Sequence, residues 1–263
     1  MTIRWTTKAK ALLLPFPGDE WTIAKRPART KVPDGTLDVA KEVKRGLKHR
    51  LEHRYNAKGN HTHDTLGRAL VDAWCARANV AFATEVLIAI CKTPHKSKAT
   101  PWPTLYQLRW DGQPWARLRE HLACASDDAR ERAHALAAAA RDEAKGELGA
   151  ALAYAFCDED WVTAELDPAI ESGYGQLAVL AATRDATQLR AAFERLMTAP
   201  RYRFEEIVPH VPCVMRVLGD AGAGLIVKAA GGASSNKARK PWLEFVACYA
   251  TPEARAFVKK HRS

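Results

Sequence analysis

Histidines that could bind a metal ion are concentrated in one short stretch of the chain, HRLEHRYNAKGNHTHDT, residues 49–65. His49 and His53 are one helical turn apart, and His61 or His63 could complete a ligand set for an ion such as Zn²⁺. However, Arg50 occupies the position that glutamate holds in the H-E-x-x-H motif, and the neighbouring lysines and arginines oppose binding of a dication. We therefore expect a basic, partly titrating surface here, with neither a metal ion nor a cofactor.

The start of this stretch belongs to a predicted amphipathic helix, residues 38–56. Its apolar residues recur every fourth position and form one stripe: Val39, Val43, Leu47, Leu51 and Tyr55. The opposite side is basic and could bind the phosphates of a nucleic acid or the carboxylates of an acidic partner. The candidate residues for this contact are Lys41, Lys44, Arg45, Lys48, His49, Arg50 and, in the following turn, Lys58. The alternative is a solvated face that only keeps the protein soluble.

A second candidate lies in HKSKATPWPTLYQLRWDGQPWARLR, residues 95–119, where aromatic and basic residues alternate. Arg109 and Trp110 are the pair best suited to hold a phosphate and stack on a base. The competing interpretation, which we favour, is that the aromatic residues Trp102, Tyr106, Trp110 and Trp115 anchor an irregular insertion onto the helices beneath it. We give the same structural role to the other tryptophans: Trp5, Trp21, Trp161 and Trp242.

Motifs typical of catalytic sites are scarce. The chain has no G-x-x-x-x-G-K-[ST] loop, no G-x-G-x-x-G after a strand and no G-x-S-x-G elbow. Asp158, Glu159 and Asp160 cluster in FCDEDW, where acidic residues at the start of a helix stabilise its dipole. We name no catalytic residue and expect binding rather than catalysis.

The positive charge of the chain is concentrated at its two ends. Residues 1–60 carry 14 Lys and Arg against 6 Asp and Glu, and residues 237–263 carry 7 against 2. The rest of the chain has a net charge of −3, although the total is +10. This asymmetry indicates an anionic partner such as a nucleic acid, a phospholipid surface or an acidic protein.

The composition is that of an ordinary globular protein, with 47% hydrophobic and 27% charged residues among 263. No apolar run approaches the ~20 residues that span a bilayer, so we expect no membrane insertion. The run Ala11–Phe16 is too short for the core of a signal peptide. The six cysteines form no C-x-x-C pair, and we expect them to be reduced and buried in a cytoplasmic protein.

Helices dominate the predicted secondary structure. Cys91, Cys124 and Cys157 are spaced by 33 residues, and each closes an apolar segment that a turn or helix start follows. In TPEARAFVKKHRS, Thr251 caps the last helix and Pro252 takes its first position. Further helices are predicted at about 147–157, 159–166, 174–183, 185–198, 204–218, 220–231 and 238–250.

Three segments resemble the HEAT-repeat family: SDDARERAHALAAAA, LGDAGAGLIVKAAGG and YATPEARAFVKK, within residues 64–260. The resemblance implies an all-α fold, a right-handed α-solenoid of antiparallel helix pairs. We expect an irregular, proline-containing arm over residues 1–36 and one helical-repeat domain over 37–263. An aromatic-rich insertion at 92–116 interrupts this domain.

HEAT-like solenoids mostly serve as interaction surfaces, so the resemblance implies a non-enzymatic scaffold or regulatory protein that binds a partner protein. The alternative is a basic HEAT-like protein that binds nucleic acid and resembles the alkylpurine DNA glycosylases. WARLREHLA, residues 115–123, only loosely matches the tryptophan and arginine pattern of those enzymes, and no catalytic residue is carried over from them. Fold resemblance alone does not establish either function.

Overall fold

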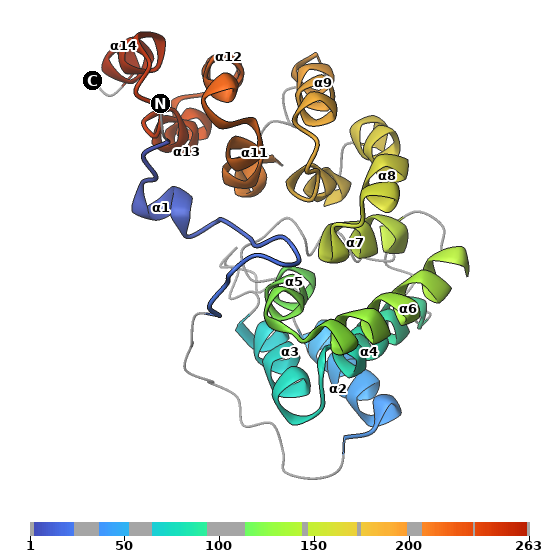
Figure 1. Cartoon of the computed structure of the whole chain (residues 1–263). Coiled ribbons are helices and arrows are strands. Elements are labelled where there is room, and N and C mark those ends of the chain that lie inside the picture. Colours follow the sequence, from blue (N-terminus) through green and yellow to red (C-terminus); the bar gives the residue numbers. More distant parts are fainter. Residues whose placement is uncertain are drawn as a thin grey trace. The chain divides into compact units, whose positions relative to one another are not determined.

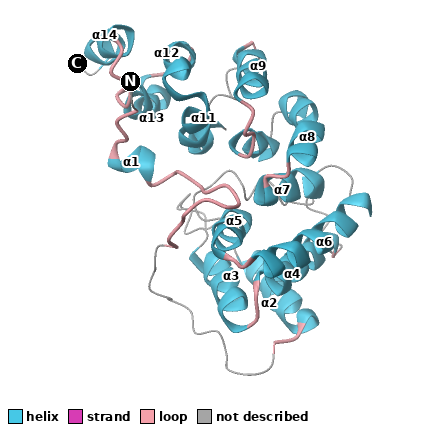
Figure 2. Ribbon diagram, viewed as in Figure 1, coloured by secondary structure: helices cyan, strands magenta, loops and turns pink. Residues whose placement is uncertain are grey.

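The structure is a computed structural model that describes residues 3–23, 37–52, 65–93, 114–143, 147–172, 175–198, 207–233 and 235–261. These residues form helices joined by turns and loops, and none of them lies in a β-strand (Figure 2). The all-α prediction is therefore confirmed for the described part of the chain. The aromatic-rich segment between residues 94 and 113 lies outside it.

The chain divides into two compact units. The continuous unit comprises residues 15–156, and the discontinuous unit comprises residues 1–14 together with residues 157–263. Each unit has its own buried side chains and is described separately below.

The described helices of the continuous unit pack against one another (Figure 1), and aromatic and leucine side chains are buried among them. Helix α4 lies against α2 and α6, and α5 lies against α3 and α7. The largest fully buried apolar side chains are Trp74, Trp115, Leu118, Leu122, Leu152 and Tyr154. The helices are α2 (Val39–Glu52), α3 (Thr65–Arg77), α4 (Val80–Lys92), α5 (Pro114–Cys124), α6 (Asp127–Glu143) and α7 (Glu147–Phe156).

The discontinuous unit joins the start of the chain to its C-terminal helices. Its core includes Phe193, Val214, Met215 and Trp242, all fully buried. Helix α12 packs against α13 and α14, and the short α1 packs against α13. The α-helices are α1 (Thr7–Lys10), α8 (Glu159–Ser172), α9 (Ala186–Met197), α11 (Val211–Leu218), α12 (Ala223–Gly231), α13 (Asn236–Val246) and α14 (Pro252–His261), with 3₁₀ segments at Gly175–Ala181, Val208–His210 and Gly219–Gly222.

The predicted capping residues begin the helices as expected. The Thr251 side chain accepts a hydrogen bond of 3.2 Å from the Ala254 amide, and Pro252 occupies the first position of α14. Asp158 accepts one of 3.1 Å from the Trp161 amide, so the acidic FCDEDW segment starts α8. Side-chain oxygens at these positions satisfy amides that have no partner inside the helix.

The predicted end of α8 before Pro168 is wrong, because the helix continues to Ser172. Proline removes one backbone hydrogen bond and usually ends a helix. Here Leu166, Ala169 and Ile170 are buried on either side of it. Their burial stabilises the continued helix beyond what local preference predicts.

The cysteines close helices as expected, but not all of them are buried. Cys124 is the last residue of α5, and Cys157 directly follows α7. None of the six cysteines forms a disulfide bond in the structure. The expected burial is wrong for Cys124, which is exposed, whereas Cys157, Cys213 and Cys248 are buried.

The described part of the predicted N-terminal arm lies on helices of both units. Residues 3–14 contain α1 and belong to the discontinuous unit, while residues 15–23 belong to the continuous unit.

Among the residues that the structure describes, no helix is long and apolar enough to cross a membrane.

Candidate binding surface and buried charge network

Helix α2 carries the predicted anion-binding residues, and its position is set by close packing on α4. Val39, Val43 and Leu47 are half-buried, as expected for an apolar stripe. At Gly46 the two helices approach so closely that a Cβ atom would lie 2.5 Å from Cδ1 of Ile90. The absent side chain thus permits the approach of α2 to α4.

The first turns of α2 also contain a buried carboxylate that sequence reasoning did not single out. Glu42 is 3% exposed and accepts a hydrogen bond of 2.8 Å from Nε1 of Trp74 on α3. Arg45 donates to both oxygens of the same carboxylate, at 2.7 and 2.8 Å. The charge of Arg45 is therefore neutralised within the fold, and this residue contributes less to an anion-binding face than its type suggests.

Lys41 and Lys44 remain on the basic side of α2, and both side chains are exposed. Among the described residues, no ion pair involves either ammonium group. Lys48, His49 and Arg50 belong to the same helix, but their side chains lie outside the described part of the chain. The remaining predicted contact residues, Lys58, Arg109 and Trp110, also lie outside it.

Most of the candidate metal ligands also lie outside the described residues. His53, His61 and His63 are outside the described residues, and within those residues no group of three potential ligands could hold a metal ion. The sequence nevertheless reads His49-x-x-Glu52-His53, a zinc-binding order that occurs in one class of metallopeptidases. Metal content is therefore worth measuring directly.

A second group of charges, on α3 and α5, forms a connected network inside the continuous unit. Arg117 is 4% exposed and binds Asp72 through two parallel hydrogen bonds of 2.5 and 3.0 Å. Arg117 also donates to Glu120 at 2.5 Å, and Arg68 donates to Glu120 at 3.0 Å. Nε2 of His121 lies 2.7 Å from the Asp72 carboxylate. This network joins α3 to α5 through charge-assisted hydrogen bonds.

The network keeps the Asp72 carboxylate ionised. Burial by itself would raise the pKa of Asp72, but the hydrogen bonds from His121 and Arg117 and their positive charges outweigh it and hold the pKa below 3.8. Burial, followed by the nearby Asp72 charge, raises the pKa of the Cys75 thiol to about 12. Cys75 is thus protonated at neutral pH and is a poor nucleophile.

Arg119 is a further buried charge, and it ties residues 15 and 16 to the helices of the continuous unit. Its side chain is fully buried, donates to the Pro15 carbonyl at 2.6 Å and lies 5.0 Å from the centre of the Phe16 ring. A weaker hydrogen bond of 3.4 Å reaches the Tyr154 carbonyl. Carbonyl oxygens and aromatic faces stabilise a guanidinium group that is removed from water.

The sequence contained a signal for this buried arginine that helical periodicity could have revealed. Trp115, Leu118 and Leu122 occupy one face of α5, and Arg119 lies on the same face. An arginine between large apolar residues at helical spacing indicates a buried charge that needs a partner. The partner itself, Pro15, could not be identified because it is 104 residues away.

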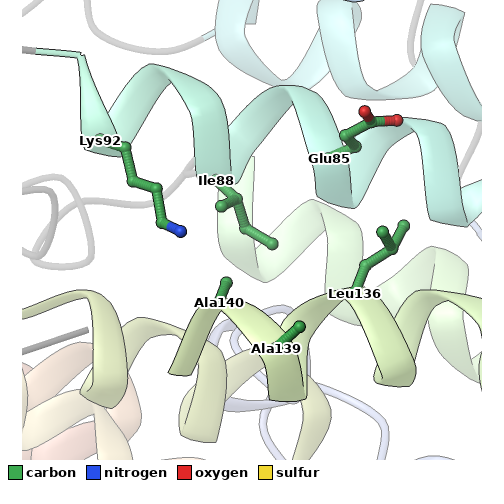
Figure 3. A pocket seen from close by; sticks show the side chains of 6 residues that line it. All are labelled: Glu85, Ile88, Lys92, Leu136, Ala139 and Ala140. Atoms are coloured by element: carbon green, nitrogen blue, oxygen red, sulfur yellow. The ribbon is translucent and has the colours of Figure 1, made fainter. Parts of the chain in front are cut away.

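A small hollow lies between α4 and α6 (Figure 3). Its volume is about 170 Å³, and the side chains of Ile88, Leu136, Ala139 and Ala140 form its apolar lining. Glu85 and Lys92 lie at opposite ends of it on α4 (Figure 3). None of the residues of the charge network lines this hollow, so the structure does not combine the two into one chemical site.

The described chain is an all-α protein of packed helices, in which the ion pairs Arg117–Asp72 and Arg68–Glu120 join α3 to α5. No protein-family model matches the chain, and comparisons with curated proteins and with solved structures find no match.

Proposed function

We propose that this chain is a non-enzymatic interaction protein that binds an acidic partner protein through the basic side of α2. Its framework would be a HEAT-like, right-handed α-solenoid of antiparallel helix pairs. The observation that carries the proposal is the contrast within α2 between Arg45, whose charge Glu42 neutralises, and the exposed Lys41 and Lys44. Exposed cations steer association with an acidic partner and contribute to its specificity.

The buried charge network supports a role in binding rather than chemistry. Asp72, Arg117 and Glu120 are engaged with one another across α3 and α5, which makes them structural clamps. The Cys75 thiol beside them is protonated at neutral pH. A rigid set of helices held in this way could present a surface of constant shape to a partner.

Fluorescence anisotropy with labelled poly-L-glutamate tests this proposal, since the polymer imitates an acidic protein surface. The wild-type protein should bind it near physiological salt, and Lys41→Glu with Lys44→Glu should weaken binding roughly tenfold. The control is Arg132→Glu with Arg184→Glu, which changes the net charge equally at exposed positions outside α2. Equal weakening by both variants would show a general charge effect and would contradict the proposal.

Nucleic-acid binding is the second candidate function. It is favoured by the meeting of residues 3–14 with the basic C-terminal helices in the discontinuous unit, which is described below. A search for release of alkylated bases from duplex DNA would then test the glycosylase-like alternative.

A further inference from the structure

Residues 3–14, the first part of the basic N-terminal region, meet the basic C-terminal helices within the discontinuous unit. The Arg4 amide donates a hydrogen bond of 2.9 Å to the carbonyl of Cys248, just after α13. Nζ of Lys8 on α1 lies 3.6 Å from Glu244 on α13, and Arg216 donates to the Leu14 carbonyl at 3.2 Å. Figure 1 shows the N-terminus beside α13 and the C-terminus beside α14.

This arrangement concentrates cations. Residues 3–14 and 235–261 together contain nine Lys and Arg residues and two acidic residues, Glu244 and Glu253. Lys8 already pairs with Glu244. The terminal basic surface is defined here by the exposed cations Arg4, Lys8, Lys10, Lys237, Lys240, Arg255, Lys259 and Lys260.

The positive potential acts on an ionisable group at the end of α14. Slight desolvation, followed by the positive charges of Arg239 on α13 and Lys260 on α14, lowers the pKa of His261 below its ordinary value of 6.5. Cations from α13 and α14 therefore both lower the pKa of the His261 ring. Gathering like charges in this way is unfavourable unless an anion offsets them.

The chemistry of the surface favours a phosphate backbone over a membrane. Leu136, in the continuous unit, is the one large hydrophobic side chain exposed among the described residues, so the terminal basic surface offers none. Peripheral membrane sites insert apolar side chains into the interface. A nucleic-acid backbone needs none, because neutralisation of phosphates and release of counterions provide the affinity.

We propose that the terminal basic surface, assembled from residues 3–14, α13 and α14, binds the phosphate backbone of nucleic acid without reading its sequence. This inference is independent of the acidic-partner proposal, which concerns α2 in the other unit. The two proposals involve different lysines and different probes, so either can fail alone.

The test is fluorescence anisotropy of the full-length protein with a labelled ~20-base-pair duplex over a salt series, where non-specific binding is expected at ~1–100 µM. The decisive variant is Lys237→Glu with Lys240→Glu, and circular dichroism checks that it is folded. Lys41→Glu with Lys44→Glu is its match on α2, since both pairs are exposed, three residues apart and near the start of a helix.

The α13 variant should weaken duplex binding roughly tenfold. It should also reduce the slope of log K against log salt concentration by the amount expected for the loss of about one to two phosphate contacts. The Arg132→Glu with Arg184→Glu variant should keep the wild-type salt slope. If the α2 variant alone weakens binding, or all three variants weaken it equally, the inference is overturned. Absence of duplex binding at low salt would overturn it as well, as would tighter binding to phosphatidylserine vesicles than to the duplex.

A local signal provides a second readout that general electrostatics would not produce. Bound phosphates would offset the charges of Arg239 and Lys260, so the pKa of His261 should rise when the duplex is added. Nuclear magnetic resonance of the His261 ring measures this change, and the Phe257 ring, 4.5 Å away between centroids, identifies its signals. If the pKa of His261 is unchanged at a saturating concentration of duplex, the duplex binds away from the terminal basic surface.

Discussion

At the scale of single residues, the clearest feature is that buried charges work in pairs. Glu42, Asp72 and Glu120 each accept hydrogen bonds from a cationic or polar side chain on the same or a neighbouring helix. Removal of one member of such a pair leaves the other without compensation, which costs more than the pair itself contributes. The buried pairs should therefore be the most sensitive polar positions of the continuous unit.

Asp72→Asn should lower the free energy of unfolding by about 2–3 kcal/mol, between the values for exposed and fully buried ion pairs. Arg117 is almost fully buried, whereas Asp72 is 34% exposed, which places the expected cost between these limits. Urea unfolding followed by circular dichroism at pH 7 measures it. Glu194→Gln, in an exposed pair with Arg190, is the control and should cost less than about 0.5 kcal/mol.

The effect of Asp72→Asn should also depend on pH. The pKa of Asp72 is lowered in the folded state, so its contribution to stability is complete above the unfolded value of about 3.8 and is lost as the pH falls through the folded value. Wild-type and variant stabilities should therefore converge in acid. An equal difference at pH 7 and in acid would show that the Asp72 charge is not responsible.

Thiol reactivity should follow exposure. We expect iodoacetamide to alkylate Cys124 well before Cys75 in the folded protein at pH 8. Cys124 is exposed, whereas burial and the charge of Asp72 raise the pKa of Cys75 to about 12. Peptide mass spectrometry over a time course measures the order, and simultaneous labelling of both thiols would contradict it.

Zinc should be absent from protein purified without an affinity tag, despite the His49-x-x-Glu52-His53 order. Arg50 and the nearby lysines disfavour a dication at this place. Mass spectrometry of the metal content checks this. One zinc ion per chain, lost in His49→Ala with His53→Ala, would contradict the expectation of no metal.

At the scale of the elements, helix packing depends on small residues at points of closest approach. Gly46 on α2 faces Ile90 on α4, where a β-branched side chain would clash with the end of the Ile90 side chain unless that side chain or one of the helices shifted. The contact thereby fixes the position of Lys41 and Lys44 on the surface.

Gly46→Val should destabilise the protein by about 1–3 kcal/mol through overpacking, although valine has a higher helix propensity than glycine. Gly224→Ala is the matched control, since its Cβ atom would meet nothing closer than a Glu253 oxygen at 3.9 Å. It should be neutral or stabilise α12 by up to about 1 kcal/mol. Thermal unfolding compares the two, and an equal response would contradict the close approach.

At the scale of the whole molecule, the two compact units differ in how the chain builds them. The continuous unit contains its own core and its own charge network. The discontinuous unit needs residues 3–14, which reach it through hydrogen bonds to Cys248 and Arg216.

Residues 15–156 expressed alone should therefore fold cooperatively, because their buried side chains and ion pairs lie within the fragment. Residues 157–263 alone should be less stable than the same unit in the full chain, since they lack residues 3–14. Circular dichroism during heating compares the fragments with the whole protein. A first fragment without a cooperative transition would show that the continuous unit depends on the rest of the chain.

The sequence by itself determined the all-α class, the approximate helix positions and several helix starts. These properties are local: Thr251 and Asp158 cap amides three residues away, and the apolar stripe of α2 follows from its own spacing. Local patterns reveal what neighbouring residues do, because helix geometry fixes which side chains share a face. The identity of the partner remains a prediction. So do the partner contacts of six residues: Lys48, His49, Arg50, Lys58, Arg109 and Trp110.

Only the tertiary structure decided which charges are exposed and which are buried. Arg45 and Lys44 are adjacent in the sequence, yet one is bound to Glu42 and the other faces solvent. Arg117 meets Asp72 across 45 residues, and Arg4 meets Cys248 across most of the chain. Such contacts depend on how helices pack, and burial, which sets the strength of each charge pair, is a property of the folded chain rather than of any segment.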